Sequence, residues 1–290
     1  MAHGRRNQHG HLLRATLTTM GFIDITIAPF THAIKASVYA RVETLRESYE
    51  HLGIWDGSYS VESLIEAMDS AGVEKALIKS QAAGSWEVSY EAVHDIVAQI
   101  PERLRGLAAI DPRDVMGGLR RLEFAVLDLG FVGAHSFPHW FGLPPDDRTY
   151  YPFYAKCVEL DVPMQVQAGQ AFQSGLRSVG RPAHFDAIAV DFPELRLVAT
   201  HTGYPWEREL ISVAWKHPNV YIGADSHNPA RWAHELVDFI RADGREKVLF
   251  GTNYPVIGFQ DALDGVAALG FDDGTRSLLL SENARRVYAL

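Results

Sequence analysis

The sequence is poor in cysteine, with one residue in 290, so the chain can form neither an internal disulfide nor a thiolate metal cluster. Cys157 lies in an amphipathic stretch, which predicts an inert thiol in the core. No run approaches the roughly 20 apolar residues that a membrane span needs, and residues 1–20 lack the apolar block of a signal peptide. These absences predict a cytoplasmic protein without a membrane partner.

Positive charge is also scarce, since 27 Lys and Arg stand against 36 Asp and Glu, for a formal net charge of −9. A nucleic-acid groove or an anionic membrane surface requires a positive field, so neither is expected as a partner. The glycine-rich phosphate loops GxGxxG and GxxxxGK[ST] are missing as well, which argues against nucleotide chemistry. A small-molecule substrate is the remaining expectation.

The composition itself, 47% hydrophobic and 22% charged, is that of a folded globular protein. Residues 1–20 are polar and basic, and we predict a disordered leader there. No Pro/Ser linker or charge block divides residues 21–290, which are predicted to form one domain.

Short β-branched or apolar segments alternate with amphipathic segments of helical length along this domain. The eight strand candidates are residues 21–28, 74–81, 104–111, 130–137, 162–168, 195–201, 219–225 and 247–253. Eight such repeats predict an α/β fold, a single (β/α)8 barrel of the TIM type, with a doubly wound open sheet as the second possibility. Residues 29–59 form an insertion after the first strand, predicted to cover the barrel mouth or to join a subunit interface.

Polar side chains gather where the predicted strands end, the edge at which barrel enzymes hold their active sites. The candidates are Asp24, Thr26, Lys79, His135, His139, Gln167, His201, Asp225, His227 and Asn253. Three aromatic residues also follow strands directly, namely Trp140, Trp206 and Tyr254. Aromatic walls with few polar groups are typical of small-molecule pockets, so we expect a fairly apolar or aromatic substrate.

Four segments in the right order carry a family resemblance: residues 132–169, 195–206, 247–255 and 281–290. Their sequences include VGAHSFPHWFG, VATHTGYPW, LFGTNYP and SENARRVYAL. They resemble the amidohydrolase-related family (amidohydrolase 2) that includes aminocarboxymuconate semialdehyde decarboxylase and other metal-dependent hydrolases and decarboxylases. The resemblance extends over residues 21–290 and implies a hydrolase or a lyase.

The resemblance implies a metal held by an Asp-x-His-x-His pair on the first strand, a histidine on the fifth and an aspartate on the eighth. This chain keeps Asp24, but Thr26 and Ala28 stand where the paired histidines belong. Gln167 and Asn253 stand at the other two positions. The family's metal site is therefore predicted to be lost, and we expect neither a metal nor another cofactor.

His201 remains at the position where the family has a histidine that polarises substrate or assists proton transfer. We therefore predict general acid/base catalysis by His201, with Asp225 as the group that orients it or acts as a second base. Gln167 and Asn253 would hold substrate oxygens through their amide groups. Thr26 and Asp24 are also candidates for substrate binding, and the alternative for Asp24 is that it stabilises the barrel mouth. Lys79, His135, His139 and His227 are predicted to bind the substrate, the first three through an anionic group.

Three functional hypotheses follow. The first is a metal-independent enzyme of the amidohydrolase superfamily that hydrolyses an ester, lactone or amide, or catalyses a related decarboxylase or lyase step. The second is a catalytically silent barrel that binds a small molecule or a partner protein. The third is a metal enzyme with a relocated site, built from His135, His201, His227 and Asp225. The resemblance also implies a homodimer.

Overall fold

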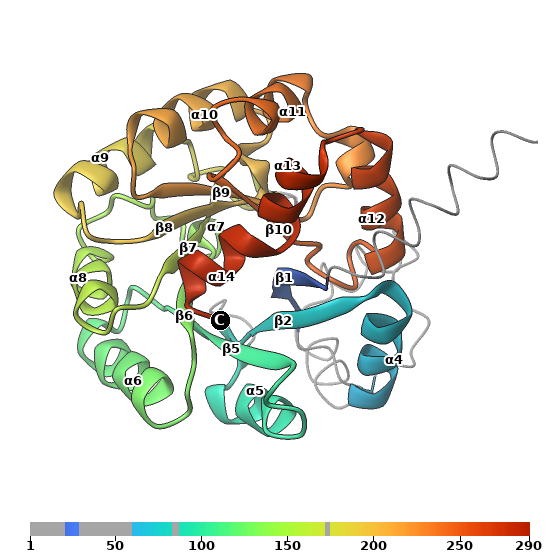
Figure 1. Cartoon of the computed structure of the whole chain (residues 1–290). Helices are drawn as coiled ribbons and strands as arrows, with labels where there is room; N and C mark the ends of the chain where they lie inside the picture. Colours follow the sequence, from blue (N-terminus) through green and yellow to red (C-terminus); the bar gives the residue numbers. More distant parts are fainter. Residues whose placement is uncertain (1–20, 29–59, 83–86, 172–174) are drawn as a thin grey trace, which may run out of the picture.

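The computed structural model describes residues 21–28, 60–82, 87–171 and 175–290. Their centre is a sheet of eight parallel strands, and each predicted strand segment overlaps one of them (Figure 1). In sheet order the strands are β1 (Phe22–Ile27), β2 (Val73–Lys79), β5 (Leu104–Ala109), β6 (Gly133–Ser136), β7 (Met164–Gln167), β8 (Leu197–Thr200), β9 (Val220–Ala224) and β10 (Val248–Phe250). The prediction of a (β/α)8 barrel is confirmed.

Amphipathic helices form the outer layer around the strands (Figure 1). They are α4 (Val61–Ala71), α5 (Tyr90–Val97), α6 (Val115–Leu127), α8 (Tyr151–Glu159), α9 (Ala183–Asp191), α10 (Glu207–Lys216), α11 (His234–Arg241) and α12 (Phe259–Ala268). Shorter elements are α7 (Pro138–Phe141), α13 (Asp273–Ser277), α14 (Asn283–Tyr288), η1 (His201–Gly203), η2 (Pro229–Arg231) and η3 (Leu278–Glu282). A small antiparallel pair, β3 (Gln81–Ala82) with β4 (Glu87–Val88), was not expected, because two-residue strands leave no periodic pattern.

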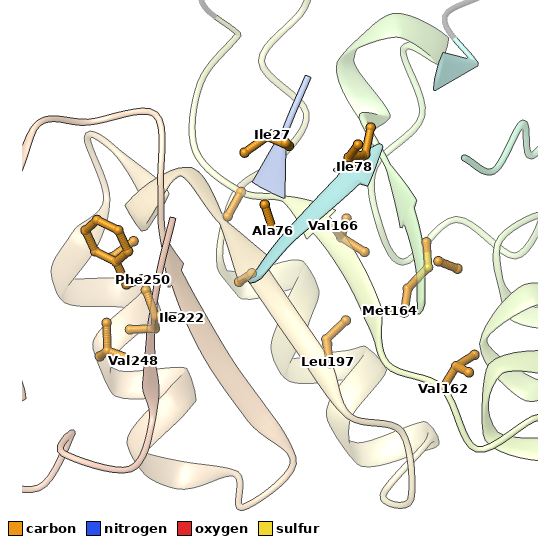
Figure 2. Packing of buried hydrophobic residues seen from close by; sticks show 14 of the residues in the cluster. Ile27, Ala76, Ile78, Val162, Met164, Val166, Leu197, Ile222, Val248 and Phe250 are labelled. Atoms are coloured by element: carbon orange, nitrogen blue, oxygen red, sulfur yellow. The ribbon is translucent and has the colours of Figure 1, made fainter. Parts of the chain in front are cut away.

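The apolar residues form two cores because each strand is buried on both faces. Figure 2 shows the larger core, which lies between the strands and the helices and includes Ile27, Ile78 and Val166. The smaller core fills the barrel interior and is completed by α14: Ile23, Ile25, Leu77, Leu107, Val198, Leu249, Ala284, Val287 and Tyr288. The Tyr288 ring lies against Gly133, the first residue of β6, so α14 closes the amino end of the barrel. The carboxyl ends of the strands lie at the opposite end.

The barrel ring closes between β1 and β10 through few contacts. Both oxygens of the Asp24 carboxylate accept the Thr252 backbone N–H at 3.1 Å, and Oδ2 accepts the Thr252 hydroxyl at 2.5 Å. The Ala28 N–H donates to the Tyr254 carbonyl at 2.8 Å, and the Asn253 N–H donates to the Thr26 carbonyl at 2.9 Å. Asp24 therefore joins the first and last strands of the ring.

Other predictions concern regions beside this framework. Cys157 is fully buried, as predicted for a core thiol, and burial raises its pKa to about 12. In the described part of the chain no helix is long and apolar enough to cross a membrane. The predicted leader, 1–20, and the predicted insertion, 29–59, lie outside the described residues.

Candidate functional site

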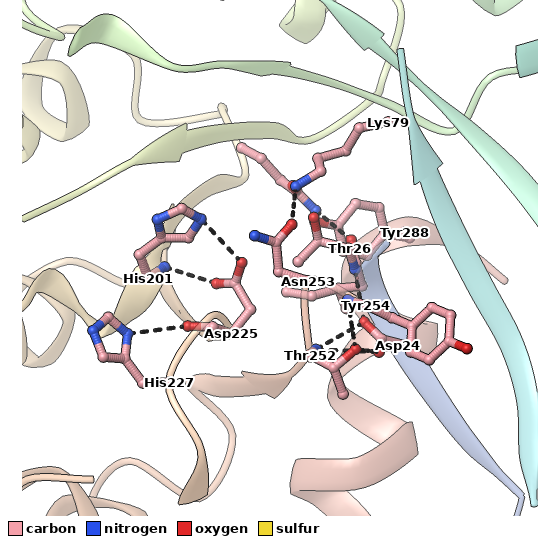
Figure 3. Close-up of polar contacts among 12 residues, drawn as sticks. Asp24, Thr26, Lys79, His201, Asp225, His227, Thr252, Asn253, Tyr254 and Tyr288 are labelled. Atoms are coloured by element: carbon pink, nitrogen blue, oxygen red, sulfur yellow. Dashed lines mark hydrogen bonds and ion pairs between the residues drawn. The ribbon is translucent and has the colours of Figure 1, made fainter. Parts of the chain in front are cut away.

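Five of the predicted polar residues come together at the carboxyl end of the barrel. Lys79 is the last residue of β2, His135 belongs to β6, and His201, Asp225 and Asn253 follow β8, β9 and β10. Figure 3 shows Lys79 and Asn253 directed toward each other, with Asp225 between Asn253 and His201. The fold thus places one cation, one carboxylate and an imidazole side by side.

Lys79 is the cationic group of this cluster and is 4% exposed. Its Nζ donates a hydrogen bond to Oδ1 of Asn253. Asn253 follows β10, so this bond crosses the place where β1 and β10 close the barrel. The same nitrogen lies 4.9 Å from the centroid of the Phe137 ring, a cation–π contact. Burial lowers the pKa of Lys79 to about 8, and the charges of Asp225 and Asp24 oppose that shift. The ammonium form is therefore retained at neutral pH.

His201 and Asp225, the predicted acid/base pair, lie next to each other in the cluster. The His201 backbone N–H donates to Oδ1 of Asp225 at 2.7 Å, which fixes the carboxylate. The other oxygen, Oδ2, lies 3.4 Å from Nε2 of the imidazole, too far for a well-formed hydrogen bond. Burial raises the pKa of Asp225 to about 6 and lowers that of His201 well below its usual value. The pair therefore holds a neutral imidazole and a carboxyl group that titrates near neutrality.

His135 extends the cluster from β6. Its Nε2 lies 2.8 Å from the Ser80 carbonyl, which can only accept, so Nε2 carries the proton and Nδ1 does not. Burial, with the Lys79 charge adding to it, lowers the pKa of His135 to about 3. The Phe137 ring lies 5.2 Å from the His135 ring and 5.9 Å from the His201 ring, centroid to centroid. Phe137, which was not among the predicted site residues, is thus the apolar surface of the cluster.

His139 and His227 lie farther out. Nδ1 of His139 accepts the Val179 N–H at 3.1 Å, and burial lowers the pKa of this histidine to about 4. Its Nε2 is buried and finds no hydrogen-bond partner within the described ranges. His227 has its ring 5.5 Å from that of Tyr204, and burial lowers its pKa. Both histidines are therefore neutral.

The backbone of these loops is left-handed at residues other than glycine. The φ angle is +64° at His201, +55° at Thr202, +61° at Ser226 and +56° at Asn253. Such angles are uncommon outside glycine and concentrate at functional sites, where the surrounding structure holds them in place. Here they turn the chain sharply after three neighbouring strands, and so they aim His201 and Asn253 at the cluster.

The remaining predicted residues occupy varied places around the mouth. Gln167 ends β7 and is buried, as is Thr26 on β1. Trp140 is half-buried in α7. The Tyr254 ring stacks on Phe259 at 4.2 Å, and the Trp206 ring lies 5.1 Å from the Arg181 guanidinium. Their contacts with a substrate remain predictions.

Comparisons with known proteins place the chain in a family. A family model, Amidohydro_2, described as amidohydrolase, matches residues 59–290. The chain belongs to this amidohydrolase family. It is an enzyme, a hydrolase or a lyase of the amidohydrolase superfamily, as predicted.

Two relatives of this amidohydrolase are a hydratase and a decarboxylase. The 2-keto-4-carboxy-3-hexenedioate hydratase of Sphingobium sp. is 28% identical over 68% of this chain and 70% of its own. The gamma-resorcylate decarboxylase of Polaromonas sp. is 21% identical over 80% of this chain and 84% of its own. Among solved structures, an uncharacterised TIM-barrel protein of Bordetella bronchiseptica superposes with a TM-score of 0.78 at 22% identity, covering 93% of this chain and 99% of that one.

A metal ion is the group that the family implies, and a dihydroxybenzoic acid decarboxylase of Polaromonas sp. was solved with bound manganese (TM-score 0.68, 18% identity, 93% and 97% coverage). The residues of this amidohydrolase do not fit such an ion. Ala28 offers no donor atom, Asp24 is engaged by Thr252, and the Lys79 ammonium occupies the Asn253 oxygen. Within the described residues, no three His, Cys, Asp or Glu side chains are grouped to hold a metal, including the relocated set of His135, His201, His227 and Asp225.

Proposed function

We propose that this amidohydrolase catalyses a lyase step, decarboxylation or hydration, on a small aromatic or unsaturated carboxylic acid, by general acid/base catalysis without a metal ion. The observation that supports it is the buried pair of His201 and Asp225 beside a buried cation, Lys79. The names of the hydratase and decarboxylase relatives fit the same chemistry. Metal independence is supported by the donor set described above.

The lyase step requires a proton at carbon, and His201 with Asp225 can supply it. In decarboxylation, the electron pair of the breaking C–C bond remains on the ring carbon, which takes a proton as CO2 leaves. In hydration, His201 and Asp225 accept a proton from water while its oxygen bonds to one carbon of the C=C bond. The electron pair of the broken π bond then takes a proton at the neighbouring carbon. A group with a pKa near the working pH is suited to both transfers, and Asp225, with its pKa raised to about 6 by burial, meets this condition.

The other side chains would position the substrate. Lys79 is oriented by Asn253, whose amide NH2 group is left to donate to a substrate oxygen. Gln167, buried at the end of β7, would donate in the same way. The Phe137 ring offers an apolar face between His135 and His201. An aromatic or conjugated acid matches one apolar face, one cation and one acid/base pair.

Hydrolysis of an ester, lactone or amide is the second candidate. It is favoured by Oδ2 of Asp225, which is buried and forms no hydrogen bond within the described residues, so it is available to take a proton from water. The same residues would then act, with Gln167 and Asn253 stabilising the oxyanion.

Turnover of a defined panel tests these proposals. The purified protein would be incubated with 2,6-dihydroxybenzoate, 5-carboxyvanillate, 2-keto-4-carboxy-3-hexenedioate and 2-pyrone-4,6-dicarboxylate, and products would be separated by liquid chromatography. We expect turnover of at least one acid, and a loss of roughly 10²–10⁴-fold in kcat for His201→Gln and for Asp225→Asn. The matched control is His234→Gln, because the His234 side chain is 79% exposed.

Each outcome has a distinct meaning. Release of CO2 or addition of water supports the lyase step, whereas ring opening of the pyrone supports hydrolysis. Full activity of the His201→Gln enzyme would refute the role given to that residue. Binding of panel acids without any turnover would instead support the silent barrel.

We further propose that the enzyme works as a homodimer in the cytoplasm. The family resemblance supports the dimer, and the single cysteine fits a reducing compartment. Light scattering coupled to size-exclusion chromatography measures the mass directly. A mass of one 32.2 kDa chain at micromolar concentration would contradict the dimer.

A further inference from the structure

We propose that the ammonium group of Lys79 is the fixed cation of this site, in place of the family's metal ion, and that it binds the carboxylate of the substrate. This inference rests on the proposed function, because it names the group that holds the acid. It adds that the positive charge is built into the chain.

Nζ of Lys79 lies beside the position of one of the family's metal ligands. It donates to Oδ1 of Asn253, and Asn253 stands at the position of the family's strand-eight aspartate ligand. A cation within hydrogen-bond distance of that side chain lies close to the place of a metal bound there. Asparagine is uncharged, so this partner does not itself pair with the ammonium charge, whereas an aspartate would.

An aromatic ring forms part of the surroundings of Nζ. Nζ lies 4.9 Å from the centroid of the Phe137 ring, and that ring is packed near His135 and His201. Both imidazoles are kept neutral by burial, in part through the Lys79 charge itself. Lys79 is therefore the positive group in contact with the apolar face of the cluster.

Two buried carboxylates, those of Asp24 and Asp225, act on the ammonium through their charge. Asp24 is held by the Thr252 hydroxyl and backbone, so its oxygens are directed into the barrel seam. Asp225 is held through Oδ1 by the His201 backbone N–H. Neither forms a hydrogen bond with Nζ among the contacts of the structure, so the ammonium can donate further protons to an incoming anion.

A fixed ammonium and a divalent ion exclude each other at this place, because two buried cations only a few ångströms apart repel strongly. Among the exchanges at Thr26, Ala28, Gln167 and Asn253, the one at Asn253 removes a negative charge, because the other ligands exchanged are neutral histidines. The carboxylates that remain nearby, Asp24 and Asp225, favour the single positive charge of Lys79. The loss of the ligands and the presence of Lys79 are thus two parts of one rearrangement.

Paired probes test the inference. Binding of 2,6-dihydroxybenzoate and of its neutral isostere 2,6-dihydroxybenzamide would be measured by calorimetry with the wild-type protein, Lys79→Met, Lys79→Arg and a surface control, Lys216→Met. We expect Lys79→Met to weaken binding of the carboxylate about 10- to 100-fold and to leave binding of the amide within about threefold. Lys79→Arg should retain most of the preference for the carboxylate, and Lys216→Met all of it.

The outcomes separate the two proposals. Equal losses for both probes, or no loss for either, in a Lys79→Met protein with wild-type circular dichroism would overturn the role of the ammonium while leaving the pocket in place. If Lys79→Met unfolds, loss of the carboxylate preference in folded Lys79→Arg would overturn it instead. Stoichiometric Mn²⁺ that competes with the carboxylate probe would also overturn it. Failure of the wild-type protein to bind either probe would refute the proposed substrate class and this inference with it.

Discussion

Replacing Thr252 by valine tests whether Asp24 holds the barrel closed. The change keeps the shape of a fully buried side chain and removes a hydroxyl that donates to Oδ2 of Asp24 at 2.5 Å and accepts the Tyr254 backbone N–H at 2.9 Å. A hydrogen bond to a charged group contributes about 1.5–3 kcal/mol. The backbone donors of Thr26 and Thr252 remain, so we expect a loss of about 2 kcal/mol in the free energy of unfolding at pH 8.

The loss of stability in Thr252→Val should depend on pH, because the Asp24 carboxyl titrates in the folded protein. Burial raises the pKa of Asp24 to about 7, from about 3.9 in an unfolded chain, so between these values the folded state holds the extra proton. Stability contributed by Asp24 is therefore present below about pH 4 and lost as the pH rises through 7. The Thr252 hydroxyl favours the ionised form. Removal of the hydroxyl should therefore lower the free energy of unfolding more at pH 8 than at pH 5.

Urea denaturation followed by tryptophan fluorescence measures both free energies. The matched control is Thr149→Val, which removes a 2.7 Å hydrogen bond from a threonine hydroxyl to Asp147 at a partly exposed turn. Water can replace that bond, so we expect a cost below about 0.5 kcal/mol. A Thr252→Val cost no larger than the control, or one that is equal at pH 5 and pH 8, would refute the proposed seam.

Further predictions concern the core, the closed end and the site. Cys157, with its pKa raised to about 12 by burial, should not react with a thiol reagent until urea unfolds the protein; rapid native labelling would contradict this. Tyr288→Phe removes an acceptor of the Gln165 amide, which still donates to the Ile25 carbonyl, so denaturation should show a loss of about 0.5–1.5 kcal/mol. Dialysis against EDTA should leave turnover of the panel acids unchanged; a loss restored by Mn²⁺ would contradict metal independence.

The strands were predictable because buried parallel strands are short apolar runs separated by helices of regular length. The polar ends of these strands were predictable for the same reason. The pairing of Lys79 with Asn253 was not, because the two residues are 174 positions apart and neither side chain alone indicates the other. The pairing of Thr252 with Asp24 was missed for the same reason, because these residues are 228 positions apart.

Aromatic residues illustrate a second limit of the sequence. Tyr254 follows a strand, as a pocket residue does, yet its ring stacks on Phe259 of α12. Phe137 had the same sequence signal and lies at the centre of the cluster. Which way a ring turns after a strand depends on the neighbouring helix, and a single sequence does not contain that geometry.

The left-handed backbone at the ends of β8, β9 and β10 bears on how this enzyme can be redesigned. Asparagine and aspartate tolerate such angles better than other residues with a side chain, so Asn253 can exchange with aspartate without moving the chain. Most other side chains at His201 or Ser226 would add backbone strain, of order 1–3 kcal/mol for each residue held in this conformation. Variation at Lys79 and Gln167, which lie on regular strands, leaves the loops intact, and directed evolution of a new specificity should begin there.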